Sequence, residues 1–139
     1  ENNLNIEFNI ALNQVNFRSG EKISMDFLFS EELYLTVYQY YPYKKVDRVQ
    51  KLFPNKYEKN NKISLKNFKL PTENLEYAVL FPENLSRAKV DEHLIFIATK
   101  ADVGFLDTYF SLEDLTKRLL EIEKKNIVRK EQKTYTIYK

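Results

Sequence analysis

The side chains that catalysis most often uses are absent from this sequence or isolated in it. The chain of 139 residues has no cysteine, one histidine (His93) and two glycines (Gly20 and Gly104). Without cysteine there is no thiolate nucleophile or thiolate metal site. A single histidine cannot form a histidine cluster or relay, and two isolated glycines cannot form a phosphate-binding loop. We interpret His93 as a structural residue at a strand edge.

Adjacent carboxylates do not predict a catalytic pair either. Glu31-Glu32, Asp91-Glu92 and Glu113-Asp114 are neighbours in the sequence. Neighbours on a strand point to opposite faces, whereas glycosidase chemistry needs two carboxylates ~5–10 Å apart across a cleft. We interpret these pairs as solvated turns and a helix N-terminus. No serine has the glycine pattern of a nucleophile elbow, so we predict a non-enzyme without cofactor or metal.

The best candidates for binding are aromatic and basic residues near the middle of the chain. The run 38–45 reads Tyr-Gln-Tyr-Tyr-Pro-Tyr-Lys-Lys. Tyrosine combines an apolar ring with a hydrogen-bonding tip, which suits protein interfaces and sugar stacking. In the competing interpretation Tyr38 and Tyr40 are core residues and the next two tyrosines only cover a hairpin. The candidate binding residues are Tyr40, Tyr41, Tyr43, Lys44, Lys45 and Tyr57.

Two neighbouring segments frame these candidates. The loop 55–62, which contains Tyr57, is either solvated or adds basic and amide groups near the hairpin. The preceding element Leu52-Phe53-Pro54-Asn55 is interpreted as structural. Phe53 would enter the core, Pro54 would end the strand because it lacks an N–H, and Asn55 would bond its own backbone in a turn.

Alternating and continuous apolar patterns predict the elements that position these residues. The expected strands cover 4–12, 23–29, 33–41, 49–53, 63–68, 75–81 and 93–99, with a last β-branched and aromatic strand at 134–138. Strand 33–41 is apolar on both faces, so it is either covered on both sides or has one apolar face that is exposed for binding. Residues 94–98 indicate burial on both faces. Ser111 as N-cap and leucines at helical spacing predict one amphipathic helix over 111–125.

About seven to eight strands and one late helix predict a mainly β fold. We expect an antiparallel β-sandwich, immunoglobulin-like or related, with the helix on an edge or end and a final strand after it. The length is near the commonest size of one domain, so 1–139 is predicted to be a single domain. Strand order stays open, because barrels share these patterns.

Charge and hydropathy indicate which partners to expect. The chain has 22 Lys and Arg against 20 Asp and Glu, a net charge of +2 that is too balanced for a nucleic-acid footprint. No run approaches the ~18 apolar residues of a membrane span. We therefore predict that the chain binds no nucleic acid and contains no membrane-spanning segment.

Several segments resemble a bacterial family known as domain of unknown function 4384. The matching pieces are Phe17 to Ile23, Tyr34-Leu35, Leu52 to Asn55, Asn61 to Ile63, Pro71 and Leu94 to Thr99. The similarity covers roughly 15–102, which makes the helix and last strand a C-terminal extension. One departure is the segment 87–91, where the family has a proline- and glycine-rich turn.

The resemblance implies a non-catalytic accessory domain of bacterial envelope or secreted proteins, with no catalytic residues to carry over. We predict a protein-interaction or scaffolding domain that binds another protein or an envelope component through strand edges and the hairpin 40–45. The alternative is a carbohydrate- or cell-wall-binding module that uses the same tyrosines. The chain starts at Glu1 without an initiator Met. We expect it to be exported, periplasmic or outer-membrane-associated, with its signal or anchor absent from this fragment.

Overall fold

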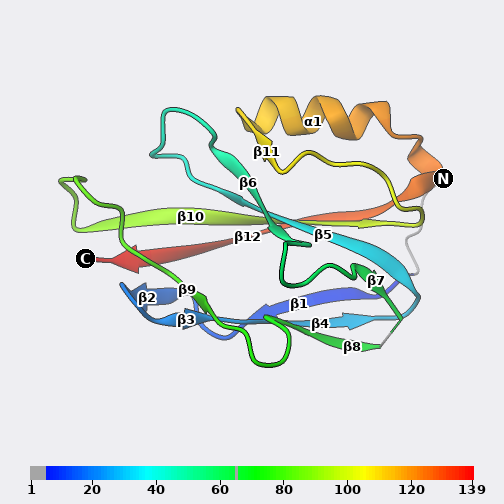
Figure 1. Cartoon of the computed structure of the whole chain (residues 1–139), viewed down its shortest axis with the longest axis horizontal. Coiled ribbons are helices and arrows are strands. Elements are labelled where there is room, and N and C mark those ends of the chain that lie inside the picture. The colour runs from blue at the N-terminus through cyan, green and yellow to red at the C-terminus, as the bar shows by residue number, and fades with distance from the viewer. Residues whose placement is uncertain (1–5, 65) are drawn as a thin grey trace.

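The strands form two main sheets that pack face to face (Figure 1). The structure is a computed structural model that describes residues 6–64 and 66–139. The smaller sheet has the order β1-β4-β8, and the larger has the order β11-β6-β5-β10-β12-β2 with β7 beside β5. A short pair, β3-β9, completes the strands. The predicted mainly β sandwich with one helix and a final strand is confirmed.

The strands have the following bounds. In the smaller sheet they are β1 (Phe8–Leu12), β4 (Met25–Phe29) and β8 (Asn67–Leu70). In the larger sheet they are β2 (Asn16–Arg18), β5 (Leu33–Tyr40), β6 (Val49–Phe53), β7 (Lys62–Ile63), β10 (Lys89–Thr99), β11 (Thr108–Tyr109) and β12 (Ile127–Tyr138). The separate pair is β3 (Lys22–Ile23) and β9 (Tyr77–Ala78).

The strand order is that of an immunoglobulin-like sandwich. The order β1-β4-β8 corresponds to strands A, B and E, and β5-β10-β12 corresponds to C, F and G. The chain leaves the smaller sheet after β1 and joins the larger one as β2, which pairs in parallel with β12 at Ile137 and Phe17. Residues 8–18 therefore contribute one strand to each of the two main sheets.

The larger sheet is buried on both faces at its centre. In β10, Leu94, Phe96 and Ala98 join the core between the sheets, whereas Ile95 and Ile97 point to the opposite face. All five are at most 1% exposed. The prediction that 94–98 is covered on both sides is thus confirmed, and β5 follows the same pattern. The core between the sheets contains several aromatic rings, and the ring of Phe27 packs against those of Phe68 and Phe96.

The helix α1 (Leu112–Glu121) covers the outer face of the larger sheet (Figure 1). Its buried residue Leu115 packs with Tyr38, Ile95, Ile97 and Tyr109. The expected place on an edge or end was therefore wrong. Ser111 is the N-cap, as predicted, and its Oγ accepts a hydrogen bond from the Asp114 N–H at 3.2 Å. The helix is shorter than the predicted 111–125, because the chain becomes extended at Ile122 and then forms the 3-10 turn η1 (Lys124–Asn126).

Several strand boundaries differ from the expectation. β12 begins at Ile127 rather than 134, because it pairs with β10 along its whole length, from Thr99 opposite Ile127 to Lys89 opposite Tyr138. Residues 129–133 are four charged residues and a glutamine, a composition that disfavours a strand, so pairing determines their conformation. The expected strand 75–81 shrinks to β9, and β2 and β11 were not predicted. Leu4 and Leu65, which belonged to expected strands, lie outside the described residues.

We expect Leu115→Ala to lower the free energy of unfolding by about 2–5 kcal/mol, because it opens a cavity beneath the helix. Leu120→Ala on the same helix is the matched control, since Leu120 is 79% exposed. It should change stability by less than about 0.5 kcal/mol. Urea denaturation of both variants measures the difference. Equal effects would contradict the packing of α1 against the sheet.

Candidate functional site

The β5–β6 hairpin carries most of the predicted binding residues. Tyr40 is the last residue of β5, and the connection 41–48 leads into β6. The Tyr41 N–H donates to the Arg48 carbonyl at 2.9 Å, and the Lys44 N–H donates to the Tyr41 carbonyl at 3.1 Å. Asp47 has a φ of 50°, a left-handed conformation that aspartate tolerates better than most residues. The hairpin is therefore an ordered turn.

A buried carboxylate anchors this hairpin to the sandwich. Glu92 lies on β10, points into the space between the sheets and is 4% exposed. Its Oε1 accepts a hydrogen bond from the Tyr135 hydroxyl of β12 at 2.6 Å. Its Oε2 accepts one from the Tyr43 hydroxyl of the hairpin. One carboxylate therefore joins β10, β12 and the hairpin.

Gln39 extends these contacts to a third tyrosine. Its Nε2 donates to the Tyr135 hydroxyl at 3.2 Å, and its Oε1 accepts from the Tyr41 hydroxyl at 2.8 Å. We call Gln39, Tyr41, Tyr43, Glu92 and Tyr135 the Glu92 network. Two of the predicted residues, Tyr41 and Tyr43, thus use their hydroxyl groups inside the domain.

Burial determines the ionisation of the Glu92 network. It raises the pKa of Glu92 above its usual range, and hydrogen bonds from Tyr135 and Tyr43 and the charge of Lys44 offset this only in part. Burial first, and then the charge of Glu92, raises the pKa of Tyr41, Tyr43 and Tyr135, and for Tyr43 and Tyr135 the hydrogen bond to Glu92 adds to this. The three hydroxyl groups therefore stay protonated at neutral pH. Two of them donate to Glu92, and Tyr41 donates to Gln39.

Sequence reasoning missed Glu92. Asp91-Glu92 was interpreted as a solvated turn, but the structure places both residues in β10, with Asp91 exposed and Glu92 buried. A usable signal was present, because residues 90, 92, 94 and 96 share one face of a strand. Because Leu94 faces the interior, extending its strand by two residues toward the N-terminus would have placed Glu92 in the interior as well. The other two carboxylate pairs lie in an exposed turn and in the first turn of α1, as expected.

Tyr40 points to the other face of the sheet. Its ring stacks on His93 of β10, with centroids 5.7 Å apart and planes inclined by 23°. His93 therefore lies in a central strand, not at a strand edge as expected. The rings of Tyr41 and Tyr43 meet edge to face, with centroids 6.0 Å apart at 62°. These two tyrosines do not form one flat stacking surface.

The tip of the hairpin is the exposed part. Lys45 is exposed and Val46 is 59% exposed. The Lys44 Nζ lies 5.1 Å from the centroid of the Tyr41 ring. The Nε of Arg48 is buried and has no hydrogen-bond partner among the residues that the structure describes. The hairpin thus carries three cations, of which Lys45 is exposed and Lys44 and Arg48 are half-buried, and one exposed apolar side chain, Val46.

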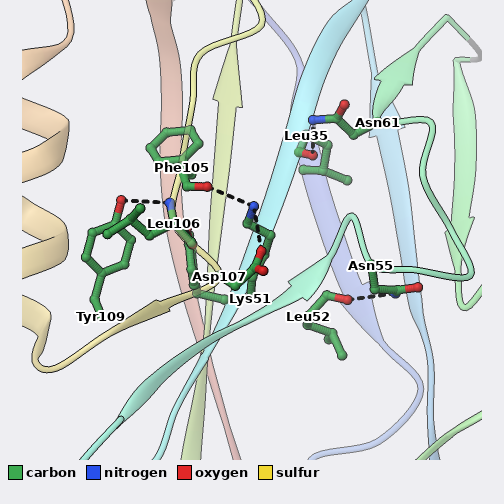
Figure 2. Close-up of polar contacts among 10 residues, drawn as sticks. Leu35, Lys51, Leu52, Asn55, Asn61, Phe105, Leu106, Asp107 and Tyr109 are labelled. Carbon is green, nitrogen blue, oxygen red and sulfur yellow. Dashed lines mark hydrogen bonds and ion pairs between the residues drawn. The ribbon is translucent and has the colours of Figure 1, made fainter.

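Tyr57 belongs to a different region. The loop 54–61 follows β6, so it lies at the opposite end of that strand from the hairpin. The structure therefore does not bring Tyr57, which is 72% exposed, next to Tyr40–Lys45, and the expected proximity was wrong. The interpretation of Leu52 to Asn55 as structural is confirmed. Phe53 is fully buried and ends β6, and the Asn55 Nδ2 donates to the Leu52 carbonyl at 2.8 Å (Figure 2).

A second buried carboxylate holds this loop. Glu58 is 5% exposed. It accepts hydrogen bonds from the Thr72 N–H at 2.6 Å, the Thr72 hydroxyl at 2.7 Å and the Asn55 Nδ2 at 2.9 Å. The Tyr77 hydroxyl is a fourth donor. Burial alone would raise the pKa of Glu58, but these donors together lower it below its usual range.

Both carboxylates have a structural role, because they hold loops in place through hydrogen bonds. Each oxygen of Glu92 and Glu58 already accepts a hydrogen bond from the domain itself. Among residues 6–64 and 66–139, no group of three His, Asp or Glu side chains is placed to hold a metal ion. In the same residues, no helix has the length and apolar character needed to cross a membrane.

Comparison with known proteins adds no further assignment. No protein-family model, no curated protein and no solved structure matches this chain. The resemblance to the domain of unknown function 4384 family stays a prediction. The functional assignment therefore rests on the geometry of the two anchored loops.

The two glutamates should give stability opposite dependences on pH. Because the pKa of Glu92 is raised in the folded state, Glu92 contributes fully to the free energy of unfolding below the usual glutamate pKa of ~4.3. This contribution is lost as pH rises. Because the pKa of Glu58 is lowered, Glu58 contributes fully to the free energy of unfolding above the usual glutamate pKa, and this contribution is lost as pH falls. Glu92→Gln should therefore lower the free energy of unfolding least at high pH, and Glu58→Gln should lower it least at low pH.

Urea denaturation from pH 8 to pH 3 measures both differences against the wild type. Glu123→Gln is the control, because the Glu123 side chain is 69% exposed. At neutral pH, Glu58→Gln should cost on the order of 1–3 kcal/mol, since it weakens hydrogen bonds to a charged acceptor. Parallel pH profiles for the two variants would contradict the assigned environments.

Proposed function

We propose that this chain is a non-catalytic protein-interaction domain whose hairpin 41–48 binds an acidic surface of a partner protein. The observation that supports this most directly is the Glu92 network. It fixes Tyr43 and Tyr41 at the base of the hairpin through the hydrogen bonds to Glu92 and Gln39. The tip beyond them is left free for a partner.

Anchoring matters for affinity because binding must order the groups that it uses. Ordering a mobile side chain at an interface costs ~0.5–1.5 kcal/mol, and a preorganised loop avoids part of that cost. Tyr43 and Tyr41 are held before any partner arrives. The buried network thus supports recognition indirectly, and its members contact the partner less than the tip does.

The charge of the tip suggests the chemistry of the partner. Lys44, Lys45 and Arg48 stand against Asp47, a formal charge of +2 over the hairpin. Val46 adds an exposed apolar contact. Complementary charge steers association and favours the correct partner. An acidic protein surface with a small apolar depression fits this tip.

The glycan alternative has weaker support. A sugar-stacking platform needs exposed and roughly parallel rings, whereas Tyr41 and Tyr43 meet at 62°. Both also direct their hydroxyl groups into the Glu92 network. The assignment to a bacterial envelope or secreted protein, whether periplasmic or outer-membrane-associated, is part of this proposal and rests on the family resemblance.

The test is affinity capture on the immobilised domain from a cell-envelope extract of the source organism. Lys45→Glu with Val46→Asp should weaken retention of the partner about tenfold or more, because two rim contacts of ~1 kcal/mol each are reversed or lost. Val15→Asp with Lys100→Glu is the matched control. Val15 is 56% exposed and Lys100 is exposed, both outside the hairpin.

Proteins retained by wild type and control but not by the hairpin variant would support the proposal. Equal retention by all three proteins would contradict the placement of the interface. Release of the bound material by soluble cell-wall glycan would favour the alternative. Urea denaturation of each variant shows whether its fold is retained.

A further inference from the structure

A cavity that is wide open to solvent lies at the end of β6 away from the hairpin. It has a volume of about 550 Å³ and is lined by Lys51, Pro54, Asn55, Lys56, Lys59 and Asp107. This volume is large enough to admit a small anion. We propose that the cavity binds a multivalent oxyanion, either a phosphate-type group or a dicarboxylate. The site is separate from the hairpin, and its test does not depend on the proposed protein partner.

Lys51 is the fixed cation of this cavity. Its side chain is only 13% exposed. The Lys51 Nζ donates to the Phe105 carbonyl at 3.0 Å and lies 3.4 Å from the Asp107 Oδ1 (Figure 2). The backbone also joins these residues, since the Lys51 N–H donates to the Asp107 carbonyl at 2.8 Å. The ammonium group is therefore held at the cavity before any ligand binds.

Asp107 is a weakly held counterion. Its side chain is 95% exposed, so solvent screens its attraction to Lys51. A ligand with two or more negative charges would compete with this single carboxylate for the ammonium group. Displacing this carboxylate would leave the segment attached to β6, because the backbone carbonyl of Asp107 accepts a hydrogen bond from the Lys51 N–H.

Lys56 and Lys59 supply further positive charge. Neither forms an ion pair with an acidic side chain in the part of the chain that the structure describes. The Lys56 Nζ lies 5.0 Å from the centroid of the exposed Tyr57 ring. Three lysines against one aspartate leave the lining with a formal charge of +2. Ammonium groups are effective point charges for phosphate and carboxylate.

The loop that carries these two lysines is ordered from within. The Asn55 Oδ1 accepts hydrogen bonds from the Tyr57 and Glu58 N–H groups, both at 2.9 Å. Glu58 in turn is held by Thr72. The side-chain amide of Asn55 is thus occupied by the loop itself, so it shapes the cavity while the lysines supply the attraction. An ordered loop loses less entropy when an anion binds.

The experiment titrates the isotope-labelled protein with inorganic pyrophosphate and, separately, with malonate, at constant ionic strength maintained with sodium chloride. Backbone amide shifts of residues 55–59 and 105–107 report binding. The variants are Lys56→Gln with Lys59→Gln, Asp107→Asn, and Lys45→Gln as a control at the other end of β6. All four positions are exposed, so the variants should fold, and their amide spectra verify this.

We expect saturable shifts in the wild type and a similar affinity in the Lys45→Gln control. The double lysine variant should bind about fivefold more weakly or worse, since each exposed ion pair contributes about two- to fivefold. Asp107→Asn should bind about two- to fivefold more tightly, because a competing carboxylate is gone. The anion that binds more tightly identifies the phosphate or the dicarboxylate class.

Three outcomes would overturn the proposal. One is a shift that grows without saturation for both anions. Another is equal weakening by Lys45→Gln and the double variant, which would reveal only general electrostatic attraction. The third is unchanged or weaker binding in Asp107→Asn, because the proposed competition at Lys51 requires the opposite sign.

Discussion

Two buried carboxylates without a cationic partner determine how the loops of this sandwich are placed. In the part of the chain that the structure describes, neither Glu58 nor Glu92 forms an ion pair. A carboxyl group removed from water is costly unless hydrogen bonds replace its hydration. Glu92 obtains them from tyrosines of the hairpin and β12, and Glu58 from Asn55, Thr72 and Tyr77. Satisfying each carboxylate therefore fixes the loop that supplies its donors.

The sheet that carries both loops is itself tightly constrained. Its centre is covered by the smaller sheet on one side and by α1 on the other, so β5 and β10 need apolar residues on both faces. Only toward the hairpin end does the interior admit Glu92. A rigid scaffold with loops at the two ends of β6 suits a binding domain, because recognition residues are often held on loops of such a frame.

Apolar periodicity predicted the central strands and the sandwich, and the serine before the helix predicted its N-cap. These features depend on local patterns, such as the continuous apolar run 94–98 and Ser111 before a leucine stripe. The early part of β12 could not be predicted from its charged residues, because pairing with β10 determines its conformation. The anchoring role of Glu92 depends on Tyr43 and Tyr135, which are 49 and 43 residues away from it in the sequence. Tyr57 was wrongly grouped with the hairpin, although the predicted strand 49–53 lies between them in the sequence and a strand separates the segments at its two ends.

The most direct test of the anchored hairpin is nitrogen-15 relaxation of the backbone amides of residues 41–48 in the free protein. If the Glu92 network holds the hairpin as described, the order parameters of the hairpin should match those of β5 and β6, about 0.85. Glu92→Leu should lower the hairpin values while those of the loop 54–61, held by Glu58, stay unchanged. Order parameters below ~0.6 in the wild-type hairpin would contradict preorganisation, and with it the physical basis proposed for partner binding.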